Sequence, residues 1–313
     1  MSAAFPLPPA KPEPAVICVG HAVLDHIFTV PHLPNAEGKH FATGYQSVGG
    51  GPAATAAVTV ARLGGLVRLW ARLGADEIGD RIIADLTTDN VGTDEVRRIA
   101  GATSSLSAVM VDPAGERMIV NHLDPALSTD PHWLPVGDLV PDSVGAVLGD
   151  LRWPDGTAHA LAAARAVGIP AVLDADTIPT PITSAPYQAA SHILFSRPGL
   201  AQYTGAETVE QGLHIASDTT DALVAVTEGG DGVRWLENGQ ARHLPAFPVA
   251  VKDTVGAGDV FHGAFALALA RRLPVHDAFR FAAGAAALKC TRPGGRAGIP
   301  TAAALTAFLD PLT

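Results

Sequence analysis

Short apolar runs alternate along this chain with longer stretches that have helical periodicity. The first run is VICVG at 16–20, and it is followed by PAATAAVTVARLGG, which has Pro52 near its start and Gly64 near its end. A proline in the first turn and a glycine after the last turn are typical helix boundaries. Further apolar runs predict strands that begin near residues 66, 145, 170, 192 and 222. The alternation predicts a mostly parallel sheet covered by helices on both faces.

Two segments do not follow this alternation. One spans about residues 26–46 and the other about residues 104–122, where two alternating runs flank the turn residues Asp112 to Gly115. Alternating polar and apolar residues on both sides of a turn are typical of hairpins. The sequence therefore predicts antiparallel strands that form a small separate sheet, and no linker divides residues 15–313 into independent domains.

The composition favours one large α/β domain. The chain has 313 residues, 48% of them hydrophobic, and a mean hydropathy of +0.24, so it can bury a large core. The first fourteen residues, MSAAFPLPPAKPEP, contain five prolines and predict a flexible arm without a secretory signal. No apolar stretch reaches the roughly 18 residues that span a bilayer.

The net charge and the cysteine content limit which binding partners and which cellular compartment we expect for the protein. The formal net charge is −10 and no run of Lys or Arg interrupts it, so we expect neither nucleic acid nor a membrane surface as a partner. The two cysteines, Cys18 and Cys290, are too few for a disulfide framework and lack metal-site spacing. We expect reduced, mostly buried thiols in a cytoplasmic protein.

The stretch DTVGAGDVFHGAFALALA carries the strongest chemical signal. Small residues at Gly256, Ala257 and Gly258 let the backbone approach a ligand and turn successive N–H groups toward one point, where the following helix adds its positive dipole end. Asp259 falls in the first helical turn, where a carboxylate can accept the proton of a hydroxyl that attacks a phosphate held there. Taken alone, Asp259 could equally complement the helix N-terminus, and the glycines could form an ordinary turn. His262, on the same helix, and the four Trp are interpreted as packing or surface residues.

Two further features follow the first predicted strand, at the sheet edge where ligands bind in folds of this class. Asp25 could accept hydrogen bonds from two sugar hydroxyls, although a lone Asp is more often a turn or cap residue. The glycines Gly49, Gly50 and Gly51 open a helix and could bring N–H groups against a substrate, although a plain tight turn is as common.

A third feature follows the strand that ends at Thr227. The sequence TEGGDG places Thr227, Gly229 and Gly232 where a nucleotide phosphate could rest. The signal is weak by itself, because GG-D-G also forms ordinary hairpins.

Together these features resemble the ribokinase-like (PfkB) family of sugar kinases, from about Val16 to the C-terminus. DTVGAGD is similar to one family signature, GGGPAATAAVTVARLGG to another and TEGGDG to the nucleotide-binding TxGxxG, and their order and spacing also agree. The resemblance implies an α/β fold, a three-layer sandwich with a mostly parallel central sheet and a small β-sheet lid. It implies ATP and Mg²⁺ as cofactors and a homodimer formed through the lid. The implied residues are Asp259 as base, Gly256, Ala257 and Gly258 as anion hole, Asp25 and Gly49 to Gly51 as substrate contacts, and Thr227, Gly229 and Gly232 as nucleotide contacts.

The chain also departs from the family pattern. Ala54 stands where many relatives have an Asn that contacts the sugar, so we expect the substrate to be held differently. The positions of an NxxE sequence that helps to place Mg²⁺ read SRPG at 196–199 and cannot supply a carboxylate, so we assign no metal ligand. Asp253 and the CTRPGG run from Cys290 match a region that binds a monovalent cation in some relatives.

A narrower resemblance is to the 6-deoxy-6-sulfofructose kinases of sulfoglycolysis, through NAEGKH, VGGGPAATAA, MIVN, DLRWPDG, FSRPGLAQYTG and ALKCTRPGGRAGIP. It implies that Lys39, Asn121 and Arg152 hold the sulfonate of a small anionic sugar, although each of the first two is, in isolation, more typical of a surface or strand-end residue. Arg152 follows a strand end beside Asp150, where an ion pair or an anionic ligand could explain it. We therefore expect ATP-dependent phosphorylation of 6-deoxy-6-sulfofructose at its C1 hydroxyl. The alternatives are a kinase for fructose, fructose 6-phosphate or another small sugar or nucleoside, and a catalytically inactive regulator.

Overall fold

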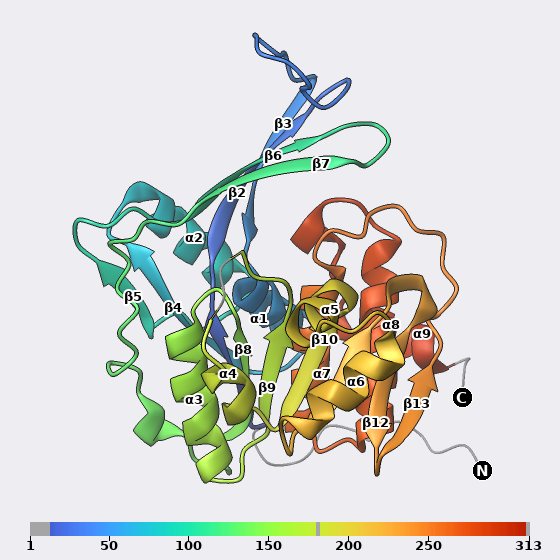
Figure 1. Ribbon diagram of the computed structural model, residues 1–313. Helices are drawn as coiled ribbons and strands as arrows, with labels where there is room; N and C mark the ends of the chain where they lie inside the picture. Colours follow the sequence, from blue (N-terminus) through green and yellow to red (C-terminus); the bar gives the residue numbers. More distant parts are fainter. Residues whose placement is uncertain (1–12, 180–181, 311–313) are drawn as a thin grey trace.

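The computed structural model describes residues 13–179 and 182–310, so the arm expected over residues 1–14 lies almost entirely outside the described residues. A large sheet runs through the centre of the molecule, and Figure 1 shows helices against both of its faces. Its strands pair in parallel except at one edge, where the last two strands are antiparallel. The order across the sheet is β13 (Gln240–Leu244), β12 (Val233–Glu237), β11 (Leu223–Thr227), β10 (His192–Ser196), β9 (Ala171–Ala175), β8 (Val144–Asp150), β1 (Ala15–Gly20), β4 (Val67–Gly74) and β5 (Val96–Ile99).

Side chains of the central strands alternate between two apolar cores. In β1, Val16 and Cys18 face one core and Ile17 and Val19 face the other, and all four are fully buried. The first core is covered by α1 (Pro52–Arg62), α2 (Glu77–Thr88), α7 (Ala257–Ala270), α8 (Val275–Cys290) and α9 (Ala302–Leu309). The second is covered by α3 (Pro154–Ala166), α4 (Ala185–Ala189), α5 (Arg197–Thr204) and α6 (Val209–Asp218). Short 3₁₀ turns occur at η1 (Val136–Asp138), η2 (Gly229–Asp231) and η3 (Gly295–Gly298).

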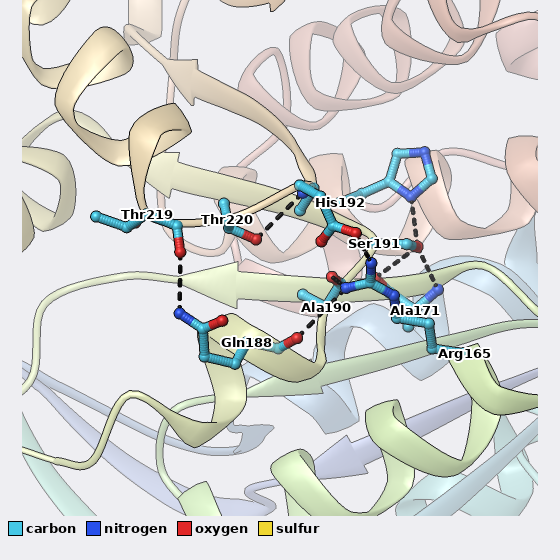
Figure 2. Close-up of polar contacts among 10 residues, drawn as sticks. Arg165, Ala171, Gln188, Ala190, Ser191, His192, Thr219 and Thr220 are labelled. Atoms are coloured by element: carbon cyan, nitrogen blue, oxygen red, sulfur yellow. Dashed lines mark hydrogen bonds and ion pairs between the residues drawn. The ribbon is translucent and has the colours of Figure 1, made fainter.

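The amino ends of β9 and β10 are held together by a compact set of hydrogen bonds, drawn in Figure 2. The Ser191 hydroxyl accepts from the N–H of Ala171 at 2.8 Å and lies 2.9 Å from Nδ1 of His192. Arg165, near the end of α3, donates to the carbonyl of Ala190 at 2.8 Å. These contacts join α3 to the starts of β9 and β10. They lie at the edge of the sheet opposite the one where ligands bind in folds of this class.

A second, small sheet projects from the large one (Figure 1). Its strand order is β3 (Gly44–Gly50), β2 (Val23–Thr29), β6 (Leu106–Val111) and β7 (Arg117–His122). The outer pairs are antiparallel, as expected from the sequence, but β2 and β6 in the middle are parallel. The expected antiparallel hairpins in a separate small sheet are confirmed, and the two hairpins lie side by side with their first strands, β2 and β6, running in the same direction.

The sequence-based strands of the large sheet agree with the structure at β1, β4, β8, β9, β10 and β11. Two placements are corrected. Asp25, which follows the first strand as expected, lies within β2 and not at a turn or cap. Of the three glycines expected to open a helix, only Gly51 caps α1, and Gly49 and Gly50 end β3. Strands β5, β12 and β13 were not anticipated. Among the described residues, no helix is both long enough and apolar enough to cross a membrane.

Candidate active site

The N-terminus of α7 has the geometry of an anion-binding site. Gly256 precedes the helix with φ of 72°, a left-handed conformation that favours glycine, and the N–H of Ala257 bonds back to the carbonyl of Thr254 at 3.1 Å. The N–H groups of Gly258 and Asp259 belong to the first turn, which has no intrahelical acceptors. A Cβ atom built at Gly258 would have no other atom within 4 Å, so the space beside this turn is open.

Asp259 lies in this first turn and has a strongly altered acidity. Burial is the main cause that raises its pKa to about 7, and the carboxylates of Asp174 and Asp150 raise it further. The positive charges of His262 and Arg296 act in the opposite direction. A carboxyl group with a pKa near neutrality can both take and release a proton at physiological pH, as a general base requires.

His262 is buried and packs against Phe261, as expected of a packing residue, but it also belongs to this cluster of titratable groups. The side chain is 4% exposed, and its Nδ1 lies 3.1 Å from Oδ2 of Asp174, near the end of β9. Burial alone would lower the pKa of His262, but the carboxylates of Asp174, Asp259 and Asp176 raise it overall. The sequence showed only a single His on an apolar helix, and the partner carboxylate is distant in the chain.

Asp150 ends β8 and joins three elements at the same edge. Its carboxylate accepts hydrogen bonds from the N–H groups of His21 at 2.8 Å, Ala53 at 3.0 Å and Arg152 at 2.8 Å. A side chain at Gly20 would lie 2.3 Å from this carboxylate, so the end of β1 must be glycine to make room. Asp150 thereby fixes the end of β1, the start of α1 and the turn before α3 around one point.

Asp25 and the glycines at the end of β3 lie at the base of the small sheet. A Cβ atom at Gly50 would lie 2.1 Å from Oδ2 of Asp25, and one at Gly49 would lie 2.1 Å from Nη1 of Arg296. The glycines therefore permit a close approach of two charged side chains, and Gly51 follows them as the N-cap of α1. Burial raises the pKa of Asp25, and the neighbouring Ser107 side chain and the charges of Arg296 and His26 partly offset that rise.

Arg296 was not anticipated from the sequence, although it lies within the ALKCTRPGGRAGIP string. Its guanidinium donates to the carbonyl of Gly50 at 2.6 Å and to the Thr55 hydroxyl at 3.2 Å. The side chain is 8% exposed, and burial lowers its pKa to about 10. Within the described part of the chain no carboxylate lies within ion-pair distance of it, so its charge acts on Asp25 and Asp259 from further away.

Asn121 lies in the same row of residues across the small sheet as Asp25, whereas Lys39 does not. The strand register places Asp25 opposite Ser107, and Ser107 opposite Asn121, so that the three follow one row across the small sheet. The Ser107 hydroxyl donates to Oδ1 of Asn121 at 2.7 Å. Lys39 lies in the loop between β2 and β3, and its exposed side chain makes no ion pair with a described residue. Figure 1 shows this loop at the outer end of the small sheet.

Arg152 lies in the turn between β8 and α3 and is half-buried. It lines a small hollow at the carboxyl ends of β8 and β9, together with Pro52, Asp150, Leu151, Asp174, Asp176 and Thr177. Its side chain has no hydrogen bond or ion pair to any residue in 13–179 or 182–310. The hollow is otherwise rich in carboxylates, so Arg152 is its cationic member.

The segment expected to contact a nucleotide forms a tight connection between β11 and β12. Thr227 ends β11 and its hydroxyl donates to the carbonyl of Phe195 at 3.3 Å, while Gly229 begins η2. Gly232 has φ of 97°, and a Cβ atom there would lie 2.1 Å from the carbonyl oxygen of Leu244. The buried Glu228 carboxylate lies 2.6 Å from Nε of Arg234.

The donor set does not provide a dedicated Mg²⁺ site. Ser196 stands where the family pattern begins its NxxE sequence, and its hydroxyl bonds to Oδ1 of Asp176 at 2.7 Å. Among the described residues, no group of three or more His, Cys, Asp or Glu side chains could hold a metal ion. Mg²⁺ commonly keeps several waters and binds through substrate phosphates with one or two carboxylates, so it would depend on the nucleotide here.

Comparisons with known proteins agree on the family. The model of the pfkB family of carbohydrate kinases matches residues 14–302. The chain is 28% identical to a ribokinase of Bacillus subtilis over 91% of its own length and 96% of the relative's, and 27% identical to a fructokinase of Solanum tuberosum over 91% and 92%. It is similar to the structure of a ribokinase-like protein from Agrobacterium tumefaciens, with 38% identity, a TM-score of 0.89 and coverage of 96% and 98%. The structure of Arabidopsis thaliana ribokinase complexed with ribose and ATP gives 27% identity, a TM-score of 0.85 and coverage of 96% and 99%.

The chain therefore belongs to the pfkB family of carbohydrate kinases and has the ribokinase-like α/β fold with a large, mostly parallel sheet and a smaller one. It is an ATP-dependent sugar kinase, a phosphotransferase.

Proposed function

We propose that this PfkB-family kinase phosphorylates the C1 hydroxyl of 6-deoxy-6-sulfofructose, giving the 1-phosphate and ADP. The observation that carries the proposal is Arg152, a guanidinium without a partner in the described residues that lines a hollow at the carboxyl edge of the sheet. The guanidinium can form charge-assisted hydrogen bonds with an anionic group on the substrate, although Asp150, Asp174 and Asp176 in the same hollow oppose a further negative charge there.

The transfer would proceed at the N-terminus of α7. Asp259 takes the proton from the C1 hydroxyl as that oxygen attacks the γ-phosphorus of ATP, and the bond from this phosphorus to the bridging oxygen of ADP breaks. The N–H groups of Gly258 and Asp259 in the Gly256–Gly258 turn and first helical turn, together with the helix dipole, would stabilise the charge on the transferred group. Mg²⁺, bound with the nucleotide, would neutralise phosphate charge. Thr227, Gly229 and Gly232 would hold the nucleotide.

The substrate would lie between α7 and the small sheet. Asp25 would accept hydrogen bonds from sugar hydroxyls, with Gly49, Gly50 and Gly51 close to the sugar ring. Asn121 and Arg152 would donate to the sulfonate, an acceptor-only group with one negative charge. Lys39 lies on the exposed loop between β2 and β3 and makes no ion pair with a described residue, so we assign its part in this pocket to a movement of the small sheet or to a second copy of the chain.

The outer strand of the small sheet supports a homodimer. On β7, Met118, Ile119 and Val120 are 38%, 52% and 60% exposed, and Tyr45 on β3 is 57% exposed. An isolated sheet of this size with apolar residues in water is marginal unless it is covered. We propose that two copies pair through their small sheets, which act as lids over the sugar. A monomeric mass at micromolar concentration in a fully active sample would contradict this.

A kinase for an uncharged sugar is the second candidate, favoured by the names of the relatives, which are ribokinases and fructokinases. The test is kcat/KM for sulfofructose, fructose 6-phosphate, fructose and ribose, measured by ADP release. We expect sulfofructose to be preferred. A phosphate monoester carries about −1.5 to −2 charges at pH 7 and would favour more positive charge than Lys39, Asn121 and Arg152 supply. A preference for ribose or fructose would replace the proposal with the second candidate.

A further inference from the structure

Lys289 is a fully buried lysine in the last turn of α8. Its side chain is 0% exposed, and lysines are almost never fully buried unless they are paired. The ammonium donates to the backbone carbonyl of Asp253 at 2.9 Å and lies 3.2 Å from Oδ2 of the same residue. Two oxygen atoms of a single residue therefore hold the charge that burial would otherwise make costly.

Asp253 connects the end of α8 with the approach to the anion hole. Its Oδ2 accepts from the N–H groups of Gly294 at 2.9 Å and Gly295 at 3.3 Å, and its Oδ1 accepts from Val255 at 2.8 Å. Burial opposes its ionisation, but the N–H groups of Val255 and Gly295 and the Lys289 ammonium hold the pKa of Asp253 below its ordinary value. Gly256 and the first turn of α7 follow directly, so the position of Asp253 sets where the anion hole begins.

The residues around Asp253 do not fit a free monovalent cation, which the family resemblance implies for this region. An ion bound by the carbonyl and carboxylate oxygens of Asp253 would have to displace the Lys289 ammonium, which already contacts both. A second positive charge at the same two oxygens would be repelled at short range. The ammonium carries the same single charge and is attached to the chain.

We propose that Lys289 is a built-in substitute for a monovalent cation, a positioning residue that orders Asp253 and the Gly294–Gly295 turn beneath the anion hole. The kinase would then require no K⁺, Na⁺ or NH₄⁺ for activity. The inference goes beyond the proposed function and does not depend on which sugar is phosphorylated, because every acceptor uses the same anion hole.

The first test is an ion panel on the wild-type protein. ADP release is measured with any sugar that is turned over, at constant ionic strength, in chlorides of K⁺, Na⁺, NH₄⁺ and tetramethylammonium. We expect kcat/KM to stay within about twofold across the panel, and the melting midpoint to be equally insensitive. Several-fold activation by K⁺ or NH₄⁺ over tetramethylammonium would overturn the proposal.

The second test removes the ammonium. Lys289→Ala should lower kcat/KM about tenfold or more in tetramethylammonium, since a lost charge-assisted contact corresponds to at least a decade. K⁺ or NH₄⁺, which can enter the space left behind, should recover part of the activity and raise the melting midpoint of this variant. Lys252→Met is the matched control, because Lys252 is the exposed neighbour of Asp253 and its loss removes the same charge without leaving a site.

The two tests together decide whether Lys289 takes the place of a monovalent cation. A Lys289→Ala protein with full activity in tetramethylammonium, or one that folds but gains nothing in activity or melting midpoint from any small cation, would contradict the substitution. If this variant does not fold in any salt, the wild-type panel decides alone. A wrong sugar assignment would leave both tests unaffected, since they use whichever acceptor is active.

Discussion

Two histidines at opposite ends of the central sheet have opposite electrostatic surroundings. His192 begins β10 at the amino edge, where its Nδ1 lies 2.9 Å from the Ser191 hydroxyl and burial lowers its pKa to about 4. His262 lies near the carboxyl edge, 3.1 Å from Asp174, and the neighbouring carboxylates raise its pKa despite burial. Both side chains approach the aromatic cluster of α7, since His192 packs edge-on against Phe265 and His262 against Phe261. The difference comes from the carboxylates that meet at one edge only.

The two edges also differ in how well their polar groups are satisfied. Ser191 and Arg165 have hydrogen-bond partners at the amino edge, as Figure 2 shows. At the carboxyl edge, Oδ1 of Asp174 and Nε2 of His262 are buried without a hydrogen-bond partner among the described residues. Unsatisfied buried polar groups cost stability, and perturbed titratable groups are concentrated at functional sites. We therefore expect the amino edge to stabilise the fold and the carboxyl edge, where we propose the phosphoryl transfer, to serve catalysis.

The largest expected effect is at Asp259. Replacing Asp259 with Asn removes the proton acceptor but keeps its size, so kcat should fall by roughly a hundredfold to ten-thousandfold. Nucleotide binding, measured by calorimetry, should remain close to that of the wild type. Near-normal turnover would remove Asp259 from the mechanism.

Arg152 is expected to contact the sulfonate end of the substrate. Arg152→Ala should lower kcat/KM for sulfofructose by roughly tenfold to a hundredfold, because a lost charge-assisted contact costs on the order of 1.5–3 kcal/mol. Activity on fructose should fall much less, since fructose has no anionic group. Equal losses on the two sugars would exclude a sulfonate pocket at Arg152.

Variants of His262 and His192 are expected to have a smaller effect, on the pH dependence of kcat/KM. His262→Asn removes a positive charge near Asp259, so the acidic limb of the pH profile of kcat/KM should move to higher pH. His192→Asn is the matched control and should leave that limb in place, because His192 faces no carboxylate of the site. Identical profiles for both variants would mean that His262 does not influence the base.

The smallest effect on activity is expected at the amino edge. Ser191→Ala leaves the N–H of Ala171 without its acceptor, which should lower the free energy of unfolding by about 1–3 kcal/mol. Chemical denaturation measures this loss, and kcat/KM at 25 °C should not change. A variant that unfolds normally but loses activity would contradict the division between the two edges.

The sequence predicted most of the large sheet because its central strands are continuous apolar runs between helical stretches. It also located Asp259 and the Gly256–Gly258 turn, which form a local signal. The roles of His262, Arg296 and Lys289 could not be read from it, because each depends on partners distant in the chain: Asp174, Gly50 and Asp253. The place of Gly49 and Gly50 at the end of a strand was not predicted, because glycine occurs both in tight turns and in strands where side chains approach closely, and a single sequence does not distinguish the two.

The most direct test of the account is the pH dependence of kcat/KM for the wild-type enzyme at saturating nucleotide. Asp259 must be ionised to accept the proton, and its pKa of about 7 means that the active form is lost as the pH falls through neutrality. We expect an acidic limb centred near pH 7, below which kcat/KM decreases about tenfold per pH unit. A rate that stays constant from about pH 5 to pH 8 would show that no group with this pKa acts as the base, and would contradict the assignment of Asp259.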